Sequence, residues 1–291
     1  MSAEQTGKTA MLSGSTGGIG TEIARLLAER GWNLALVNRS VEKSEQQATD
    51  LQRDHPGVAI SLYQADLLDQ ASIVKVCKEV AAGHLRLSAI YNIAGLLTDK
   101  RITSQDGLEG HFAINTVAPY LFAENLKGAL AASAQAGERP VVVNFGSSAV
   151  NSVKRLDVSS LANPAEIGGL MGAYATSKLA LMAMTLAMNE GTAESGILFE
   201  SVDPGPTRTT MTQSGDGMPW FLRPLVPFIF KPAEVQAKRL VDGVEKATEE
   251  NRSGLYISEG KRKQYPAIAR DESVQSEVMD LLSKATEQAT T

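Results

Sequence analysis

Short apolar runs alternate with longer stretches of helical periodicity along most of the chain. The apolar runs predict strands at residues 9–12, 33–37, 59–64, 88–92, 141–145, 198–202 and 255–257. The stretches between them predict helices near residues 19–30, 41–53, 70–82, 107–136, 172–194 and 232–248. Strand and helix therefore follow one another in regular order.

This regular order is typical of a parallel sheet with helices on both faces. We expect an α/β fold: a single Rossmann-fold domain over residues 1–291, with a doubly wound parallel sheet of about seven strands. No linker or shift in composition divides the chain. Near its end, apolar residues at Val274, Val278 and Leu282 predict one amphipathic helix over 272–289, packed on the body or on a neighbouring subunit.

Composition and charge exclude several classes of function. A net charge of −5 argues against a nucleic-acid partner, because phosphates bind to a basic surface. The longest apolar patch, 218–230, is broken by prolines and is too short to span a bilayer. The single cysteine, Cys77, and three scattered histidines provide neither an internal disulfide nor a set of metal ligands. We expect a cytoplasmic protein with no signal peptide, transmembrane segment or metal.

A glycine-rich turn links the first predicted strand to the first predicted helix. It contains Gly14, Ser15, Thr16, Gly17, Gly18, Ile19 and Gly20. Glycines let the backbone turn tightly and approach a pyrophosphate, and the new helix adds free N–H groups and its positive dipole end. The spacing fits both G-x-x-x-G-x-G and G-x-x-G-x-x-G. The turn thus predicts a bound dinucleotide and leaves the subclass open.

The end of the second predicted strand bears on which dinucleotide is bound. An NAD site usually has Asp or Glu there, to accept hydrogen bonds from ribose hydroxyls. This chain has Asn38, Arg39 and Ser40 instead. Arg39 can bind a 2′-phosphate through two parallel hydrogen bonds, unless it is only a solvated surface charge. NADP(H) is therefore favoured over NAD(H).

Two residues at the end of the third predicted strand are further candidates for the cofactor site. Asp66, followed by Leu67, can accept a hydrogen bond from an adenine amino group. Alternatively, Asp66 caps the next helix, a role for which Asp69 competes.

Tyr174 and Lys178 lie four residues apart at the start of a long apolar helix, so both side chains can face one cleft. A free tyrosine has a pKa near 10, which is too high for a base at neutral pH. A fixed positive charge nearby stabilises the phenolate and lowers that pKa. The same spacing is common by chance, so its context has to decide.

The context is a series of motifs in a fixed order. The glycine-rich turn is followed by Asn-Ile-Ala-Gly at 92–95, by Asn115, by Asn-Phe-Gly-Ser-Ser at 144–148, by Tyr174 and Lys178, and by Pro-Gly at 204–205. Together these motifs resemble the short-chain dehydrogenase/reductase superfamily over roughly residues 8–260. A long interval between Ser147 and Tyr174, and the sequence around Asn115, are similar to retinol-dehydrogenase-like and protochlorophyllide-reductase-like members.

The resemblance implies a role for each catalytic candidate. Tyr174 would be the general acid in reduction and the general base in oxidation. Lys178 would bind the nicotinamide ribose and lower the tyrosine pKa. Ser147, with Ser148 as the alternative, would hydrogen-bond the substrate oxygen. Asn115 would hold a water that links Lys178 to solvent.

The resemblance also implies supporting segments around this site. Further cofactor contacts would come from the turns after the fourth and sixth strands: Asn92, Ala94, Gly95, Pro204, Gly205, Thr207 and Thr209. An insert over 151–169 would loop out near the active-site mouth. A substrate lid over 210–231 contains bulky apolar residues, which suit an apolar substrate or subunit packing. We expect a homodimer or homotetramer.

The predicted function is NADP(H)-dependent interconversion of an apolar carbonyl and its alcohol. One alternative is a nucleotide-sugar epimerase or dehydratase of the extended branch of the superfamily, whose loop spacing Gly17 permits. The other is a non-catalytic dinucleotide-binding redox sensor. The substrate and the physiological direction are not evident from the motifs.

Overall fold

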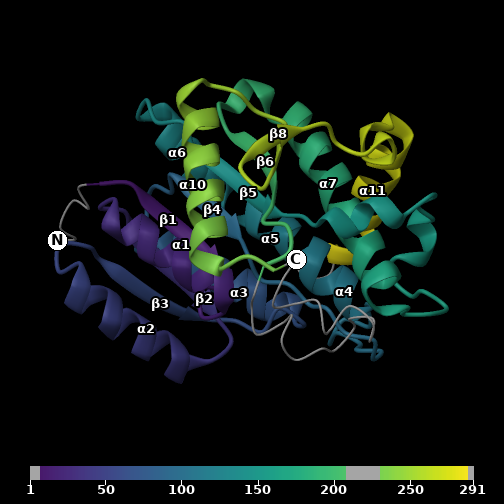
Figure 1. Cartoon of the computed structure of the whole chain (residues 1–291), viewed down its shortest axis with the longest axis horizontal. Helices are drawn as coiled ribbons and strands as arrows, with labels where there is room; N and C mark the ends of the chain where they lie inside the picture. The colour runs from purple at the N-terminus through teal and green to yellow at the C-terminus, as the bar shows by residue number, and fades with distance from the viewer. Residues whose placement is uncertain (1–6, 208–229, 288–291) are drawn as a thin grey trace.

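One mixed sheet forms the centre of the molecule (Figure 1), and the computed structural model describes residues 7–207 and 230–287. Within these residues the strand order is β3-β2-β1-β4-β5-β6-β7-β8, with every neighbouring pair parallel except β7 and β8. The strands are β1 Thr9–Ser13, β2 Asn33–Asn38, β3 Ile60–Gln64, β4 Ala89–Asn92, β5 Val141–Phe145, β6 Leu198–Asp203, β7 Leu255–Ser258 and β8 Lys261–Lys263.

The sheet has eight strands among the described residues, so the expectation of about seven was one short. The extra strand, β8, pairs antiparallel with β7. A tight turn joins them, with Glu259 at φ 50° and Gly260 at φ 78°. All three residues of β8 are basic and exposed, so no apolar run marks this edge strand in the sequence.

Helices cover both faces of the sheet. One face carries α1 Gly18–Glu29, α2 Val41–Asp54 and α10 Ala233–Glu249, and α1 and α10 lie side by side (Figure 1). The other carries α3 Gln70–Gly83, α5 Ala118–Asn125, α6 Lys127–Gln135, α7 Ala173–Gly191 and α11 Glu272–Thr286. Leu36 and Val37, neighbours on β2, belong to the two opposite cores, as the alternation of side chains along a strand requires. The expected doubly wound α/β domain is confirmed.

The stretch predicted as one helix over 107–136 is interrupted twice. It begins as α4 Gly110–Phe112, passes through a π-helical turn at Ala113–Val117, and breaks again at Leu126 between α5 and α6. Pro119 has no N–H to donate to the carbonyl of Asn115, four residues earlier, and its ring crowds that carbonyl. A shift of hydrogen-bond register immediately before Pro119 relieves this conflict.

The insert and the C-terminal helix pack on the same side of the body. Leu156, Val158 and Leu161 are buried in the core that also contains Val278 and Leu282 of α11. α11 in turn packs along α7. Much of the insert therefore belongs to the hydrophobic core instead of looping out, because its apolar residues meet the apolar face of α11.

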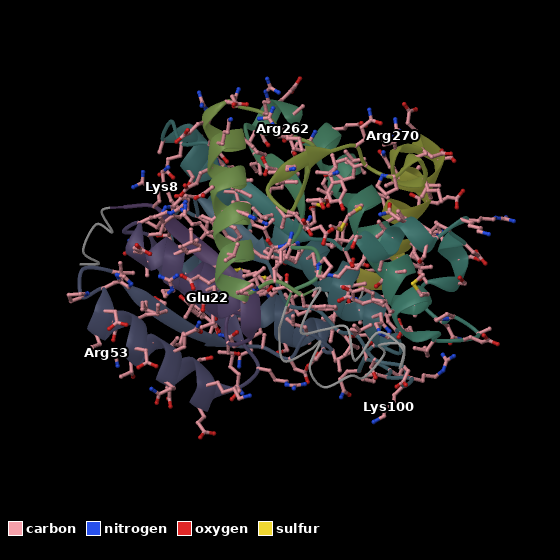
Figure 2. All side chains as sticks on the ribbon, in the orientation of Figure 1. Lys8, Glu22, Arg53, Lys100, Arg262 and Arg270 are labelled. Atoms are coloured by element: carbon pink, nitrogen blue, oxygen red, sulfur yellow. The ribbon has the colours of Figure 1, made fainter. Side chains whose placement is uncertain are left out.

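Charged side chains surround this apolar interior. Figure 2 shows Lys8, Arg53, Lys100 and Arg270 around the outline of the molecule, and all four are exposed. Among the described residues, no helix is both long enough and apolar enough to cross a membrane.

Candidate active site

The glycine-rich turn passes directly against the start of the loop after β4. Gly14 has φ 75°, and its N–H donates to the Val37 carbonyl at 3.0 Å. A Cβ on Gly14 would lie 2.7 Å from Cα of Ala94, and one on Gly20 would lie 2.3 Å from the Gly14 carbonyl oxygen. The turn therefore closes only with glycine at both positions.

Helix α1 begins at Gly18 with its N-terminal N–H groups available. Its N-cap is Gly17, which provides no side-chain hydrogen bond, and its first turn contains no acidic residue. Such an end favours an anion, because the free N–H groups and the helix dipole both present positive charge.

A buried hydrogen-bonded triad fixes the second residue of the turn. The Ser15 hydroxyl donates to Oε1 of Gln47 at 2.8 Å and accepts from Nδ2 of Asn38 at 2.8 Å. Gln47 also donates to the Ser15 carbonyl at 2.9 Å. Oδ1 of Asn38 is buried without a partner among the described residues. It can therefore accept a further hydrogen bond at the carboxyl end of β2.

The next residue along the chain, Arg39, is exposed, and its guanidinium has no partner within 7–207 and 230–287. Ser40 caps α2 by accepting from the Lys43 N–H at 3.3 Å. Of this group, only Arg39 has a charged side chain that is free to meet a ligand.

The two candidates that follow β3, Asp66 and Leu67, differ in their contacts. Asp66 accepts from the Leu68 N–H at 3.0 Å, whereas Asp69 caps α3. The alternative role of Asp66 as the cap is therefore wrong. Leu67 is half-buried and packs on the core.

Asn92 is buried and donates to Oδ1 of Asn144 at 2.8 Å, which joins the ends of β4 and β5. Its own Oδ1 has no partner among the described residues. Ala94 packs on Gly14, and Gly95 follows it in the same half-buried loop. Asn92 thus supports the sheet, and Ala94 and Gly95 line the loop beside the glycine-rich turn.

Tyr174 and Lys178 lie one turn apart near the start of α7, and they are 9% and 4% exposed. Ser147, which follows β5, lies close enough to Tyr174 for its side chain to lower the pKa of the phenol. Ser148 is exposed, so Ser147 is the serine that faces Tyr174. The Lys178 ammonium donates to the Phe145 carbonyl at 2.5 Å.

The environment of this pair determines its protonation. Burial raises the pKa of Tyr174, the nearby side chain of Ser147 lowers it, and the charge of Asp203 raises it. Burial lowers the pKa of Lys178 to about 7, and Asp203 opposes that effect. Lys178 is not among the groups that lower the tyrosine pKa. Tyr174 is therefore a protonated phenol at neutral pH.

The amide of Asn115 is fully committed to its neighbours. Its Oδ1 accepts from the Leu96 N–H at 2.9 Å, and its Nδ2 donates to the Leu96 carbonyl and to the Ser177 hydroxyl at 3.1 and 3.0 Å. Ser177 in turn donates to the Tyr174 carbonyl at 2.8 Å. Asn115 thus joins the loop after β4 to the start of α7.

The turn after β6 is held by Asp203. Gly205 has φ 66° and donates its N–H to Oδ1 of Asp203 at 2.8 Å, and Thr207 donates to the Gly205 carbonyl at 3.0 Å. Pro204 begins this turn, and its carbonyl accepts from Gln236. Thr209 and positions 210–229 of the expected lid lie outside the described residues.

Residues 8–218 match the family of the short chain dehydrogenases. This chain belongs to that family. It is 28% identical to retinol dehydrogenase 13 of Mus musculus over 275 residues, which is 92% of this chain and 80% of the relative. It is 27% identical to the polyprenol dehydrogenase of Mus musculus over 277 residues, which is 93% of this chain and 81% of the relative. The resemblance inferred from the motifs is confirmed.

Solved structures share the fold of this short-chain dehydrogenase. The short-chain dehydrogenase from Sphingobium yanoikuyae in complex with NADPH has a TM-score of 0.67 at 22% identity, covering 95% of each chain. The 3-ketoacyl-(acyl-carrier-protein) reductase from Brucella melitensis complexed with NADH has a TM-score of 0.64 at 17% identity, covering 87% of this chain and 96% of that one. Both cofactors thus occur on this fold.

The short-chain dehydrogenase family binds a nicotinamide dinucleotide, and the residues of this chain fit one. The turn at Gly14 and Gly20 leaves no room for a Cβ, and α1 begins with free N–H groups. Oδ1 of Asn38, at the carboxyl end of β2, is buried without a partner among the described residues.

Sequence reasoning missed four residues of this short-chain dehydrogenase: Gln47, Glu109, His111 and Asp203. Asp203 directly precedes the Pro-Gly motif at a strand end, a position that could have been recognised. Glu109 lies in the first turn of the helix predicted over 107–136, where acidic residues are common. The contacts of Gln47 and His111 depend on segments distant in sequence, so no local pattern marks them.

Proposed function

We propose that this short-chain dehydrogenase interconverts an apolar carbonyl and its alcohol with NADP(H), by direct hydride transfer. The observation that carries the proposal is the placement of Tyr174 and Lys178 one helical turn apart in a buried site, with the Ser147 side chain close enough to lower the pKa of the phenol. All three lie beyond the carboxyl ends of the strands, where open α/β sheets bind their ligands.

The residues of the site divide the proton chemistry between them. Tyr174, protonated at neutral pH, donates its proton to the carbonyl oxygen as the alcohol forms, and accepts it back in oxidation. Ser147 hydrogen-bonds the same oxygen and stabilises the negative charge that develops there. The bound dinucleotide supplies or accepts the hydride. Lys178, one helical turn from Tyr174, would bind its ribose hydroxyls.

Proton resupply runs past Asn115 in this scheme. Because the amide of Asn115 is already committed, we assign the relay water to its main-chain carbonyl. Pro119, four residues later, has no N–H to donate to that carbonyl.

Arg39 is the basis for proposing NADP(H). Its guanidinium is exposed and free among the described residues, directly after β2. A 2′-phosphate there would gain a charge-assisted bidentate contact, whereas a carboxylate would have repelled it.

The proposed substrate class is an isoprenoid alcohol and its aldehyde. Two relatives are named for retinol and polyprenol, both of which are isoprenoid alcohols. The apolar sequence of 218–230 suits such a chain, because burying apolar surface is the main source of affinity for it.

The test is NADPH oxidation, followed by absorbance at 340 nm, with all-trans-retinal as the probe and Tyr174→Phe as the inactive variant. We expect turnover by the wild type and a loss of about 1,000-fold or more in the variant, because both proton transfer and positioning are removed. Tight NADPH binding with no turnover of retinal or of other apolar aldehydes and ketones would contradict the proposal.

We also propose a cytoplasmic homodimer or homotetramer. The location rests on the single cysteine, Cys77, which is buried. Light scattering at micromolar concentration tests the assembly, and a monomer would contradict it.

A further inference from the structure

Two buried side chains beside the active site have no part in the reaction scheme above. Glu109 and His111 are 4% and 0% exposed. Nδ1 of His111 lies 2.7 Å from Oε1 of Glu109, and Nε2 accepts from the Thr98 N–H at 3.2 Å. A ring nitrogen that accepts carries no proton, so the proton of the imidazole is on Nδ1 and is donated to Glu109. Both ring nitrogens are therefore fixed.

The imidazole held in this way packs against the ring of Tyr174. The two ring centroids are 6.3 Å apart and the ring planes meet at 78°, an edge-to-face arrangement. Tyr174 is the second residue of α7, so its backbone is fixed by the helix while its side-chain torsions depend on packing. His111 provides part of that packing.

Glu109 connects this contact to the surrounding chain. Its Oε2 accepts from the N–H groups of His111 and Phe112 at 2.9 and 3.1 Å, which caps the start of α4. Its own N–H donates to the Ala162 carbonyl in the insert at 2.8 Å. The pair therefore joins the loop at Thr98, the insert and the helical segment that leads to Asn115.

We propose that His111, held by Glu109, is a positioning residue that sets the orientation of the Tyr174 phenol. Only the expected effect on the reaction rate rests on the proposed function; the orientation of the phenol does not. The phenolic oxygen has to reach both Ser147 and the substrate oxygen, and a displacement of about 1 Å can cost on the order of 100-fold in rate. Because both ring nitrogens of His111 are held by hydrogen bonds, its imidazole ring limits such a displacement of the phenol.

The chain provides a matched control for this inference. His84, at the C-terminus of α3, is also buried and also packs edge-to-face on a tyrosine, with its centroid 6.1 Å from that of Tyr63 at 66°. Tyr63 lies on the edge strand β3. His84→Gln therefore removes the same kind of contact outside the active site.

The experiment compares His111→Gln with His84→Gln in two measurements. The first is kcat and KM for NADPH-dependent reduction of all-trans-retinal. The second is the 13Cζ resonance of Tyr174 in protein labelled with [13Cζ]tyrosine, assigned among the six tyrosines by its loss in Tyr174→Phe. We expect His111→Gln to lower kcat about 10- to 100-fold, leave KM for NADPH within about twofold and shift the Tyr174 signal. His84→Gln should shift only Tyr63.

Two outcomes would overturn the inference: an unmoved Tyr174 signal in His111→Gln, or equal losses of kcat in the two variants. If His111→Gln does not fold, Glu109→Gln replaces it, since it retains the ring and an acceptor but removes the charge. It should shift the same signal, and an unmoved signal overturns the inference. Absence of turnover in the wild type would contradict the proposed function, and the resonance would still decide whether His111 orients Tyr174.

Discussion

Asn38 and Arg39 are adjacent in the chain, yet their side chains lie in opposite environments. Asn38 is buried and donates to the Ser15 hydroxyl at 2.8 Å, while Arg39 is exposed. The first therefore braces the glycine-rich turn, and the second remains available to a ligand. The proposed function thus assigns support of the glycine-rich turn to Asn38 and the choice of NADP(H) to Arg39.

This division predicts a selective effect of Arg39→Ala. The loss of a charge-assisted bidentate contact costs about 1.5–3 kcal/mol, so the Kd for NADPH should rise roughly 10- to 100-fold. The Kd for NADH should hardly change. Fluorescence titration with each cofactor measures this, and Arg53→Ala, which removes an exposed arginine of α2, is the control. Equal weakening for both cofactors would show that Arg39 does not read the 2′-phosphate.

Alanine substitutions at two glycines of the glycine-rich turn should have different effects on dinucleotide binding and on stability. Gly14→Ala should abolish binding of either dinucleotide and destabilise the fold by about 1–3 kcal/mol, because the new Cβ strains φ 75° and meets Ala94. Gly17→Ala should be tolerated, since Gly17 has φ −125° and a Cβ there meets nothing within 4 Å. Thermal unfolding and NADPH titration compare the two. Equal stability of both variants would contradict the strain at Gly14.

Glu200 predicts a pH-dependent stability. It is fully buried on β6, and neither carboxylate oxygen has a partner among the described residues. Burial raises its pKa from 4.5 to about 8, against the charge of Arg262. A raised folded-state pKa gives stability that is full below pH 4.5 and is lost as pH rises towards 8.

Glu200→Gln should therefore gain stability over the wild type by roughly 1.4 kcal/mol per pH unit in that window. Urea unfolding at pH 5, 6.5 and 8 measures the difference. Glu194→Gln, at an exposed position, should show no such trend. A constant difference between Glu200→Gln and wild type would mean that Glu200 gains water or a partner when ionised.

The ionisation of Lys178 should make the stability of the fold depend on pH in the opposite direction. Burial lowers its pKa from 10.5 to about 7, so the folded state loses its proton first as pH rises. Stability is then reduced below pH 7 and recovers between pH 7 and 10.5. Relative to Lys178→Met, the wild type should gain roughly 1 kcal/mol from pH 7 to pH 8. Denaturant unfolding at the two pH values measures this, and a flat difference would contradict the shifted pKa.

The sequence by itself determined the fold class and the family. The strand predicted at residues 141–145 coincides with β5 Val141–Phe145, and the other predicted strands overlap their observed counterparts. This succeeded because strands buried on both faces are mainly apolar runs, and because the glycine-rich turn permits no other residue at Gly14. Both constraints act on residues that are neighbours in the chain.

Only the tertiary structure decided what individual polar side chains do. It committed the Asn115 amide to Leu96 and Ser177, and it turned Asn38 towards Ser15. It also set His111 against Tyr174, 63 positions away in the sequence. A side chain's hydrogen-bond partner depends on which strand ends and loops the fold brings together, and local sequence patterns do not contain that information.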